Sequence, residues 1–171
     1  MPVIDRDQMM RVLVEACPSF RREWEAFRAE WKDSTDDLPL YIALAALARH
    51  LIGMLERGER DGLARAFGAV EQLQLEGEPC VREAAVIGLL ENLQNLNLHA
   101  TTDPDQLRPF LGPESAEAWD ELYGFWQKVG EIKAAGVLEP VPGLSPRLDP
   151  GPVHDPRSRR ERGGGAKPRA R

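Results

Sequence analysis

The chain has only two cysteines among its 171 residues, Cys17 and Cys80, and neither belongs to a CxxC pair or to a Cys/His spacing that holds zinc. This argues against a disulfide framework and a structural zinc site, and we expect two reduced thiols. Aromatic residues are scarce, at 6%, and β-branched residues are few. A composition rich in Leu, Ala, Glu and Arg with so few strand-forming residues is typical of an all-α protein.

Long hydrophobic runs are missing as well. The longest, residues 38–48, ends at Arg49 and is too short to cross a bilayer. The first residues hold no apolar segment of signal-peptide length behind a basic end. We therefore expect a cytoplasmic protein that does not bind membranes.

Familiar catalytic motifs are also absent. No HExxH, GxGxxG, P-loop or GxSxG motif occurs, and His50, His99 and His154 lie in three unrelated contexts. We therefore expect that the protein is not an enzyme and that it needs no metal or cofactor. His50 follows Arg49 at the one polar interruption of an apolar segment, where a structural histidine is the better interpretation.

What the chain does have is apolar residues at helical spacing, punctuated by proline and glycine. The pattern predicts helices over residues 5–16, 19–32, 39–57, 61–76, 79–93 and 114–135, with a helix of one or two turns starting near residue 104. The segments 39–57 and 79–93 are apolar over most of their circumference, so we expect them at the centre of the fold. Gly88, inside the second of them, would let a neighbouring helix approach closely.

These elements predict an all-α domain over residues 1–138, a compact bundle of about six to seven helices. The helices at 61–76 and 79–93 should form an αα-hairpin similar to one unit of a HEAT-type repeat. No second copy with that period follows, which argues against a solenoid.

Residues 139–171 differ in kind from the rest. They hold seven prolines, five glycines and a run of arginines but almost no large apolar side chains, so we expect a disordered tail. The tail carries eight basic and four acidic residues, whereas residues 1–138 carry 14 basic and 24 acidic ones and a net charge of −10. Three interpretations of the tail stay open: a solvated linker, a weak nucleic-acid contact, or docking on the acidic domain.

Four positions are candidates for a site. Glu91 and Asn92 lie between leucines at the end of the helix at 79–93. Two roles stay open for them: a partly buried, paired carboxylate, or a side chain that caps or tethers the helix end. His99 lies in the polar loop that follows, which could hold a ligand or a proton-transfer group. Phe125 lies at the edge of the apolar arc of the last helix and should be exposed. The other aromatics at helical spacing should pack in the core: Trp24, Trp31, Trp119, Tyr123 and Trp126.

Four short segments carry a resemblance. They are Cys17-Pro18-Ser19-Phe20, Leu38-Pro39, the run from Val81 to Leu93, and Leu111-Gly112-Pro113. Over about residues 8–135 the chain resembles a largely uncharacterised family of small all-helical bacterial proteins, some of which look like immunity proteins of toxin systems. The resemblance implies a helical fold and a protein partner, and it supplies no catalytic residues.

Three functional hypotheses follow. The first is a non-catalytic protein-binding module, an immunity or antitoxin-like inhibitor whose acidic surface masks a basic toxin, because an acidic domain attracts basic partners and repels nucleic acid. The second is an accessory or scaffold protein. The third is a small enzyme using His99 and Glu91. The oligomeric state stays open.

Overall fold

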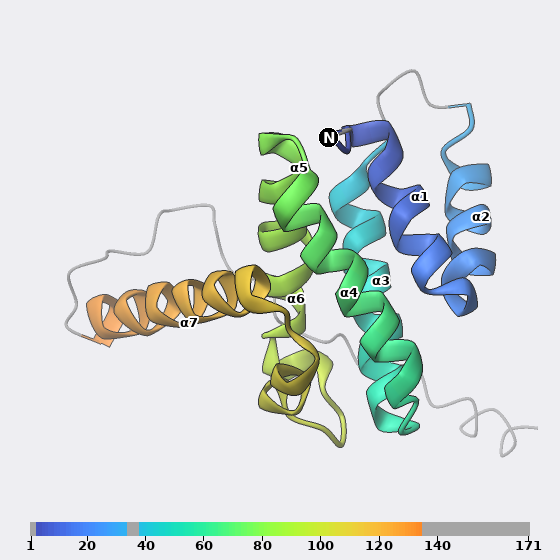
Figure 1. The fold of residues 1–171 in the computed structure, drawn as a ribbon. Helices are drawn as coiled ribbons and strands as arrows, with labels where there is room; N and C mark the ends of the chain where they lie inside the picture. Colours follow the sequence, from blue (N-terminus) through green and yellow to red (C-terminus); the bar gives the residue numbers. More distant parts are fainter. Residues whose placement is uncertain (1–2, 34–37, 135–171) are drawn as a thin grey trace, which may run out of the picture.

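The structure of the chain, a computed structural model, describes residues 3–33 and 38–134 (Figure 1). The predicted tail at 139–171 lies outside the described residues, as do the last residues of the predicted 1–138 domain. Within the described ranges the chain forms helices and one isolated β-bridge, between Ile4 and Gly77, which confirms the all-α prediction.

The helices follow one another with short links. Their bounds are α1 (Arg6–Ala16), the 3-10 turn η1 (Pro18–Phe20), α2 (Arg21–Glu30), α3 (Leu40–Glu56), α4 (Arg60–Glu76), α5 (Pro79–Glu83), the π-helix η2 (Ala84–Leu90), α6 (Glu91–Leu93), the 3-10 turns η3 (Leu96–Leu98) and η4 (Pro104–Phe110), and α7 (Pro113–Ala134). α5, η2 and α6 follow without a break, so they correspond to the single helix predicted at 79–93. No helix in the described part of the chain combines the length and the apolar character needed to cross a membrane.

The start of the chain is tied to the middle of the fold. Asp5 begins α1 with a capping box, in which its side chain accepts from the Gln8 backbone N–H while the Gln8 side chain accepts from the Asp5 N–H. Just before it, the Ile4 N–H donates to the Glu76 carbonyl oxygen over 2.8 Å, and the Glu78 N–H donates to the Ile4 carbonyl oxygen over 2.9 Å. α1 packs on α4 as a result.

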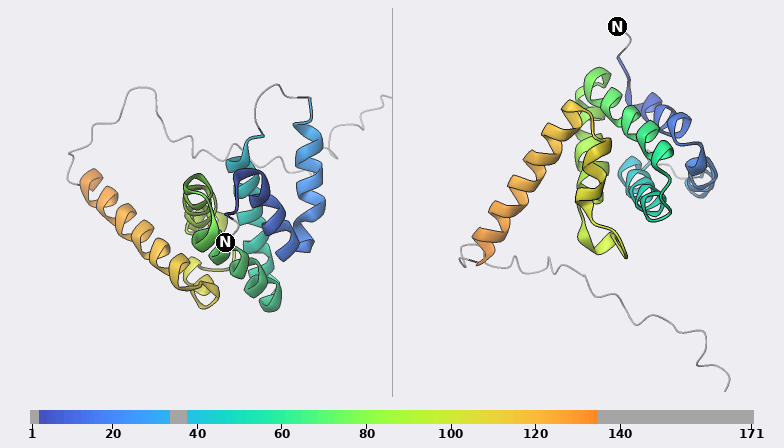
Figure 2. Two further views of the ribbon diagram at one scale, coloured as in Figure 1. Left: turned by 45° about the horizontal axis from the view of Figure 1, so that its top comes forward. Right: turned by 60° about the horizontal axis from the view of Figure 1, so that its bottom comes forward.

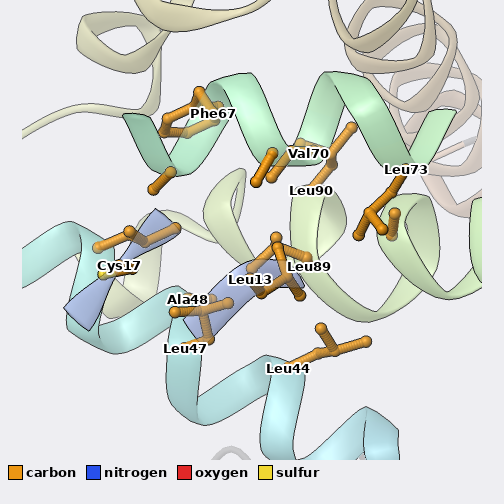
Figure 3. Close-up of a cluster of buried hydrophobic side chains, with 14 of the residues drawn as sticks. Leu13, Cys17, Leu44, Leu47, Ala48, Phe67, Val70, Leu73, Leu89 and Leu90 are labelled. Atoms are coloured by element: carbon orange, nitrogen blue, oxygen red, sulfur yellow. The ribbon is translucent and has the colours of Figure 1, made fainter. Parts of the chain in front are cut away.

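The core is centred on α3 and the helix from α5 to α6, as predicted. Leucines of both helices are buried completely and meet under α4 (Figure 3). The labelled side chains include Leu44 and Leu47 of α3, Val70 of α4, and Leu89 and Leu90 of η2. α3 is not surrounded on all sides as predicted, because Tyr41 and Ile42 in its first turn are exposed, and Arg49 and Glu56 are exposed further along.

A π-helix in the middle of the second core helix was not predicted. The chain packs η2 closely on α3, and a Cβ at Gly88 would lie 2.7 Å from Leu44 Cδ1 and 3.3 Å from Leu44 Cβ. The predicted close approach at Gly88 is therefore confirmed. Asn92 donates its side-chain N–H to the Gly88 carbonyl oxygen over 2.9 Å, so it tethers the end of the π-helix. π-Helical turns are rare and are found frequently at functional sites.

The αα-hairpin prediction needs qualification. α4 and α5 are consecutive and joined by Gly77 and Glu78, but the helix that starts with α5 packs chiefly against α3 and less against α4. α4 and the helix that starts with α5 also pack against each other, so the predicted hairpin is present, with its second helix in contact mainly with α3.

α7 is anchored to the bundle by its first turns and then leaves it (Figures 1 and 2). Ser115, Trp119 and Leu122 are buried, whereas most side chains from Phe125 to Glu131 are exposed. The prediction that the helically spaced aromatics pack in the core is therefore confirmed for Trp119 and wrong for Trp126, which is exposed. Its spacing is that of a core residue, but among residues 3–33 and 38–134 no other helix covers that part of α7.

Glu71 of α4 holds the start of α7. Its Oε1 accepts from the Glu114 N–H over 2.9 Å, and its Oε2 accepts from the Ser115 N–H over 2.9 Å and from Ser115 Oγ over 2.7 Å. Burial raises the pKa of Glu71, but these three hydrogen bonds to its charged form outweigh it and lower the pKa overall. Gly112 is required beside it, since a Cβ there would lie 2.3 Å from the Glu71 carboxyl carbon.

Candidate functional site

A groove of about 690 Å³ opens where α7 leaves the bundle. One wall comes from the end of the second core helix and the turn after it, which contribute Ile87, Glu91 and Leu96; the other comes from Tyr123 and Trp126 of α7. The groove exists because α7 diverges from the helix beside it, as the two views of Figure 2 show.

Large apolar side chains line the groove and stay open to solvent. Ile87 is 43% exposed, Leu96 64% and Trp126 46%. Phe125, next to Trp126, is 57% exposed as expected, and its ring meets the Trp126 ring edge-on at a centroid distance of 5.2 Å. These four are half of the eight exposed large apolar residues in the described ranges, so the exposed apolar surface is concentrated at one place.

Glu91 is the acidic group of the groove. Burial raises its pKa, and among the described residues it forms no salt bridge. Asn92, Gln94, Asn95 and Asn97 add amide groups to the same groove. Gln94 is committed to the fold, because its side-chain N–H donates to the Trp119 carbonyl oxygen over 2.7 Å. The groove therefore presents apolar side chains around one unpaired carboxylate.

A carboxyl whose pKa is raised in the folded protein binds protons more readily there than in the unfolded chain, so stability falls as pH rises through the window above its ordinary value of 4.5. We therefore expect Glu91→Gln to raise the melting temperature at pH 7. The corresponding gain in the free energy of unfolding should be less than about 1 kcal/mol, because solvent screens the group. The difference should vanish below pH 4.5 in thermal melts. Glu83→Gln, on the exposed side of the same helix, is the control, and a melting temperature lowered by Glu91→Gln would contradict the expectation.

A second cluster of polar groups connects α3 with η1 and α2. Ser19 Oγ lies 2.8 Å from His50 Nε2, and His50 Nδ1 lies 2.7 Å from Glu23 Oε1. The His50 ring is almost buried and packs edge-on against Phe20 at 5.4 Å, whereas Ser19 and Glu23 are exposed. Sequence reasoning interpreted His50 as a structural residue and did not see its partners, because they lie 31 and 27 positions away.

Ser19 faces a cleft of about 540 Å³, lined also by Met54 and by the start of α4. Gly58, which also lines the cleft, follows the end of α3 in the left-handed conformation, with a φ of 71°. The end of the Met54 side chain lies against Gly62 of α4, 2.5 Å from where a Cβ on Gly62 would be. Within the described ranges, no three His, Cys, Asp or Glu side chains gather in a way that would hold a metal ion.

The comparisons with known proteins place the chain in a family. The family described as "Domain of unknown function (DUF7674)" matches residues 10–127. The chain belongs to it. This agrees with the resemblance to an uncharacterised helical family, whereas nothing in the match bears on immunity proteins. No curated protein and no solved structure matches the chain.

In this DUF7674 domain the four predicted site positions do not form one site. Glu91 and Asn92 line the groove, and Phe125 lies beside it. His99 bonds elsewhere: its Nε2 lies 2.9 Å from the Leu93 carbonyl oxygen and its Nδ1 lies 2.9 Å from Thr102 Oγ1. Both ring nitrogens of His99 thus have partners other than Glu91, so the structure does not build the His99 and Glu91 pair of the third hypothesis.

Proposed function

We propose that the groove between the second core helix and α7 is a non-catalytic protein-binding site that takes a basic protein partner. The observation that carries the proposal is the gathering of Ile87, Leu96, Phe125 and Trp126, all exposed, around that groove. Monomeric proteins rarely leave such a patch uncovered, and aromatic side chains at the centre of a patch supply much of the binding energy in protein interfaces.

The distribution of charge supports a basic partner. Residues 69–138 carry twelve acidic and four basic residues, whereas residues 1–68 carry twelve and ten. The acidic excess therefore belongs to the half of the domain that builds the groove. Complementary charge raises the association rate and selects against acidic partners.

The finer proposal is an immunity or antitoxin-like inhibitor acting in the cytoplasm. It is supported by the acidic half described above, and it follows from the sequence resemblance to a family of which some members look like immunity proteins. A toxin that acts on nucleic acid needs a basic site to bind phosphates, and an acidic surface with apolar anchors would cover such a site. No catalytic group of the domain is needed for this role.

The test uses the full-length protein as bait for an extract of its source cells, beside Trp126→Ala and Leu75→Ala. Trp126 lies in the groove, whereas Leu75 is 61% exposed on α4 and does not line the groove, so it is the matched apolar control. We expect a basic protein retained by wild type and by Leu75→Ala, with an affinity for Trp126→Ala weakened by about tenfold or more in calorimetry with the purified partner.

Expression of that partner alone should arrest growth, and coexpression of this domain should restore it. A partner that binds wild type and Leu75→Ala more tightly than Trp126→Ala, but does not change growth when expressed, would favour the scaffold hypothesis over the inhibitor. Partners retained equally by Trp126→Ala and Leu75→Ala, or acidic partners only, would contradict the groove proposal itself.

A further inference from the structure

We propose that Ser19, His50 and Glu23 form an acyl-transfer site, in which Ser19 is the nucleophile and small carboxylic esters are the substrate class. The proposal is independent of the groove, since the two sites share no residue. It rests on a continuous chain of hydrogen bonds in which a hydroxyl, an imidazole and a carboxylate follow one another at 2.8 Å and 2.7 Å.

The Glu23 carboxylate determines the direction of both hydrogen bonds in this chain. An ionised Glu23 can only accept, so His50 Nδ1 must carry the hydrogen and donate it. In the neutral ring Nε2 is then the acceptor, and the Ser19 hydroxyl donates to it. This is the arrangement in which a serine is activated by an adjacent base that a third group orients.

The other neighbours of the hydroxyl do not compete with His50. Cys17 Sγ lies 3.5 Å and Met54 Sδ 3.8 Å from Ser19 Oγ, and sulfur is a weak hydrogen-bond partner. The ring itself has little freedom, because it is almost buried and packed against Phe20. Ser19 is exposed on the wall of the cleft, so a substrate reaches the hydroxyl while the base behind it is held in place.

The same domain contains an internal comparison. Thr102 and His99 also form a hydroxyl and imidazole pair, at 2.9 Å, but the second ring nitrogen of His99 bonds to the Leu93 carbonyl oxygen. A carbonyl oxygen orients the ring without a negative charge to stabilise the imidazolium that forms when the base takes a proton. Of these two pairs, only the Ser19 pair has the third, charged member.

The cleft also contains groups suited to a developing negative charge. α4 starts in its wall, and no side chain caps that helix. The N–H groups of Asp61 and Gly62, in the first turn, have no acceptor within the helix. Together with the helix dipole, such N–H groups favour negative charge at the start of α4, which lines the same cleft as Ser19.

The reaction balances without a cofactor. Ser19 Oγ attacks the ester carbonyl carbon while its proton passes to His50 Nε2; the bond to the leaving oxygen then breaks, and His50 returns that proton to the departing alcohol. A water molecule hydrolyses the acyl-serine in the same way, giving its proton to His50 and releasing the acid as Ser19 recovers the proton. The net change is ester plus water to acid plus alcohol.

The experiment combines a fluorophosphonate probe with p-nitrophenyl acetate hydrolysis, both on the full-length protein. The probe reports nucleophilicity directly, since the Ser19 oxygen would form a bond to phosphorus as fluoride leaves. We expect one label, mapped by peptide mass spectrometry to Ser19, and no label in Ser19→Ala. Glu23→Gln should react about tenfold or more slowly with both reagents, because the charge that orients His50 and stabilises its protonated form is gone.

Both changed side chains are exposed, so the variants should fold, and circular dichroism checks this. Thr102→Ala is the control for the other pair and should react like wild type. Three results would overturn the proposal: no labelling above that of Ser19→Ala, a label on another residue, or equal rates in Glu23→Gln and wild type. In each of these cases the hydrogen-bond chain is only a tie between α3 and the start of α2.

Discussion

Leu47→Asp is expected to unfold the domain. Leu47 is 1% exposed in the middle of α3, where it meets the second core helix (Figure 3). An unpaired carboxylate at that place costs several kcal/mol, while the total stability of a domain is about 5–15 kcal/mol. The variant should lose most of its helical signal in circular dichroism at 25 °C, or melt far below the wild type.

Ile42→Asp is the matched control, because it places the same charge on the same helix at a residue that is 54% exposed. It should melt within a few degrees of wild type. A soluble Leu47→Asp protein with full helicity and an unchanged melting temperature would show that α3 is not the centre of the core.

Val86 is less buried than the apolar pattern of its helix predicts. Sequence reasoning puts it in the same central class as Leu47, since both belong to segments that are apolar nearly all round. In the structure Val86 is half-buried and packs at the edge of the core, while Ala85 and Leu89 are completely buried. A segment that is apolar nearly all round does not show which of its residues face the core, and Val86 lies on the less covered side of the π-helix. Val86→Asp should therefore cost less than Leu47→Asp.

The elements themselves were predictable because their signals are local. Asp5 caps α1, Pro18 follows its end, and Gly58 ends α3. Such signals lie within a few residues of the helix end that they define. The predicted start of α7, residue 114, differs from Pro113 by one residue, and its predicted end at residue 135 lies outside the described residues.

The arrangement of the elements was less predictable, because it depends on contacts between distant residues. Nothing in the sequence around Glu71 shows that it holds residues more than forty positions later, at Glu114 and Ser115. Likewise, Trp126 has the spacing of a core residue, and its exposure follows only from the direction in which α7 leaves the bundle. The cluster of Ser19, His50 and Glu23 could not be predicted either, since three common residues at irregular spacing form no motif.

The absence of catalytic motifs therefore does not exclude catalysis by residues that are distant in the sequence. A motif records residues that are close in sequence, whereas a serine, a histidine and a carboxylate can meet from separate helices in any order. The expectation that the domain is not an enzyme stays a prediction, and labelling at Ser19 decides it. Binding in the groove and reaction at Ser19 use different residues, so each can hold without the other.

Glu71→Gln is expected to loosen α7 and lower stability by about 1–2 kcal/mol at pH 7, as loss of a helix cap does. Both carboxylate oxygens of Glu71 accept, one from Glu114 N–H and the other from Ser115 N–H and Oγ–H. An amide has one acceptor oxygen, so its NH₂ would face a donor and one side of the cap would be lost. Thermal melts and amide hydrogen exchange at the start of α7 measure the effect, with Glu117→Gln, exposed on α7, as the control.

The pH dependence gives an independent check on the cause. The folded pKa of Glu71 lies below its ordinary value of 4.5, so the charged cap stabilises the fold fully above that value. The difference between wild type and Glu71→Gln should shrink as pH falls from 4.5 through the lowered pKa, where Glu71 itself becomes protonated. Gly112→Ala should reproduce the loss at pH 7 by displacing the carboxylate that lies 2.3 Å from the added Cβ. Since α7 forms one wall of the groove, both variants should also weaken partner binding, while a loss of stability independent of pH would show that the charge of Glu71 is not what holds α7.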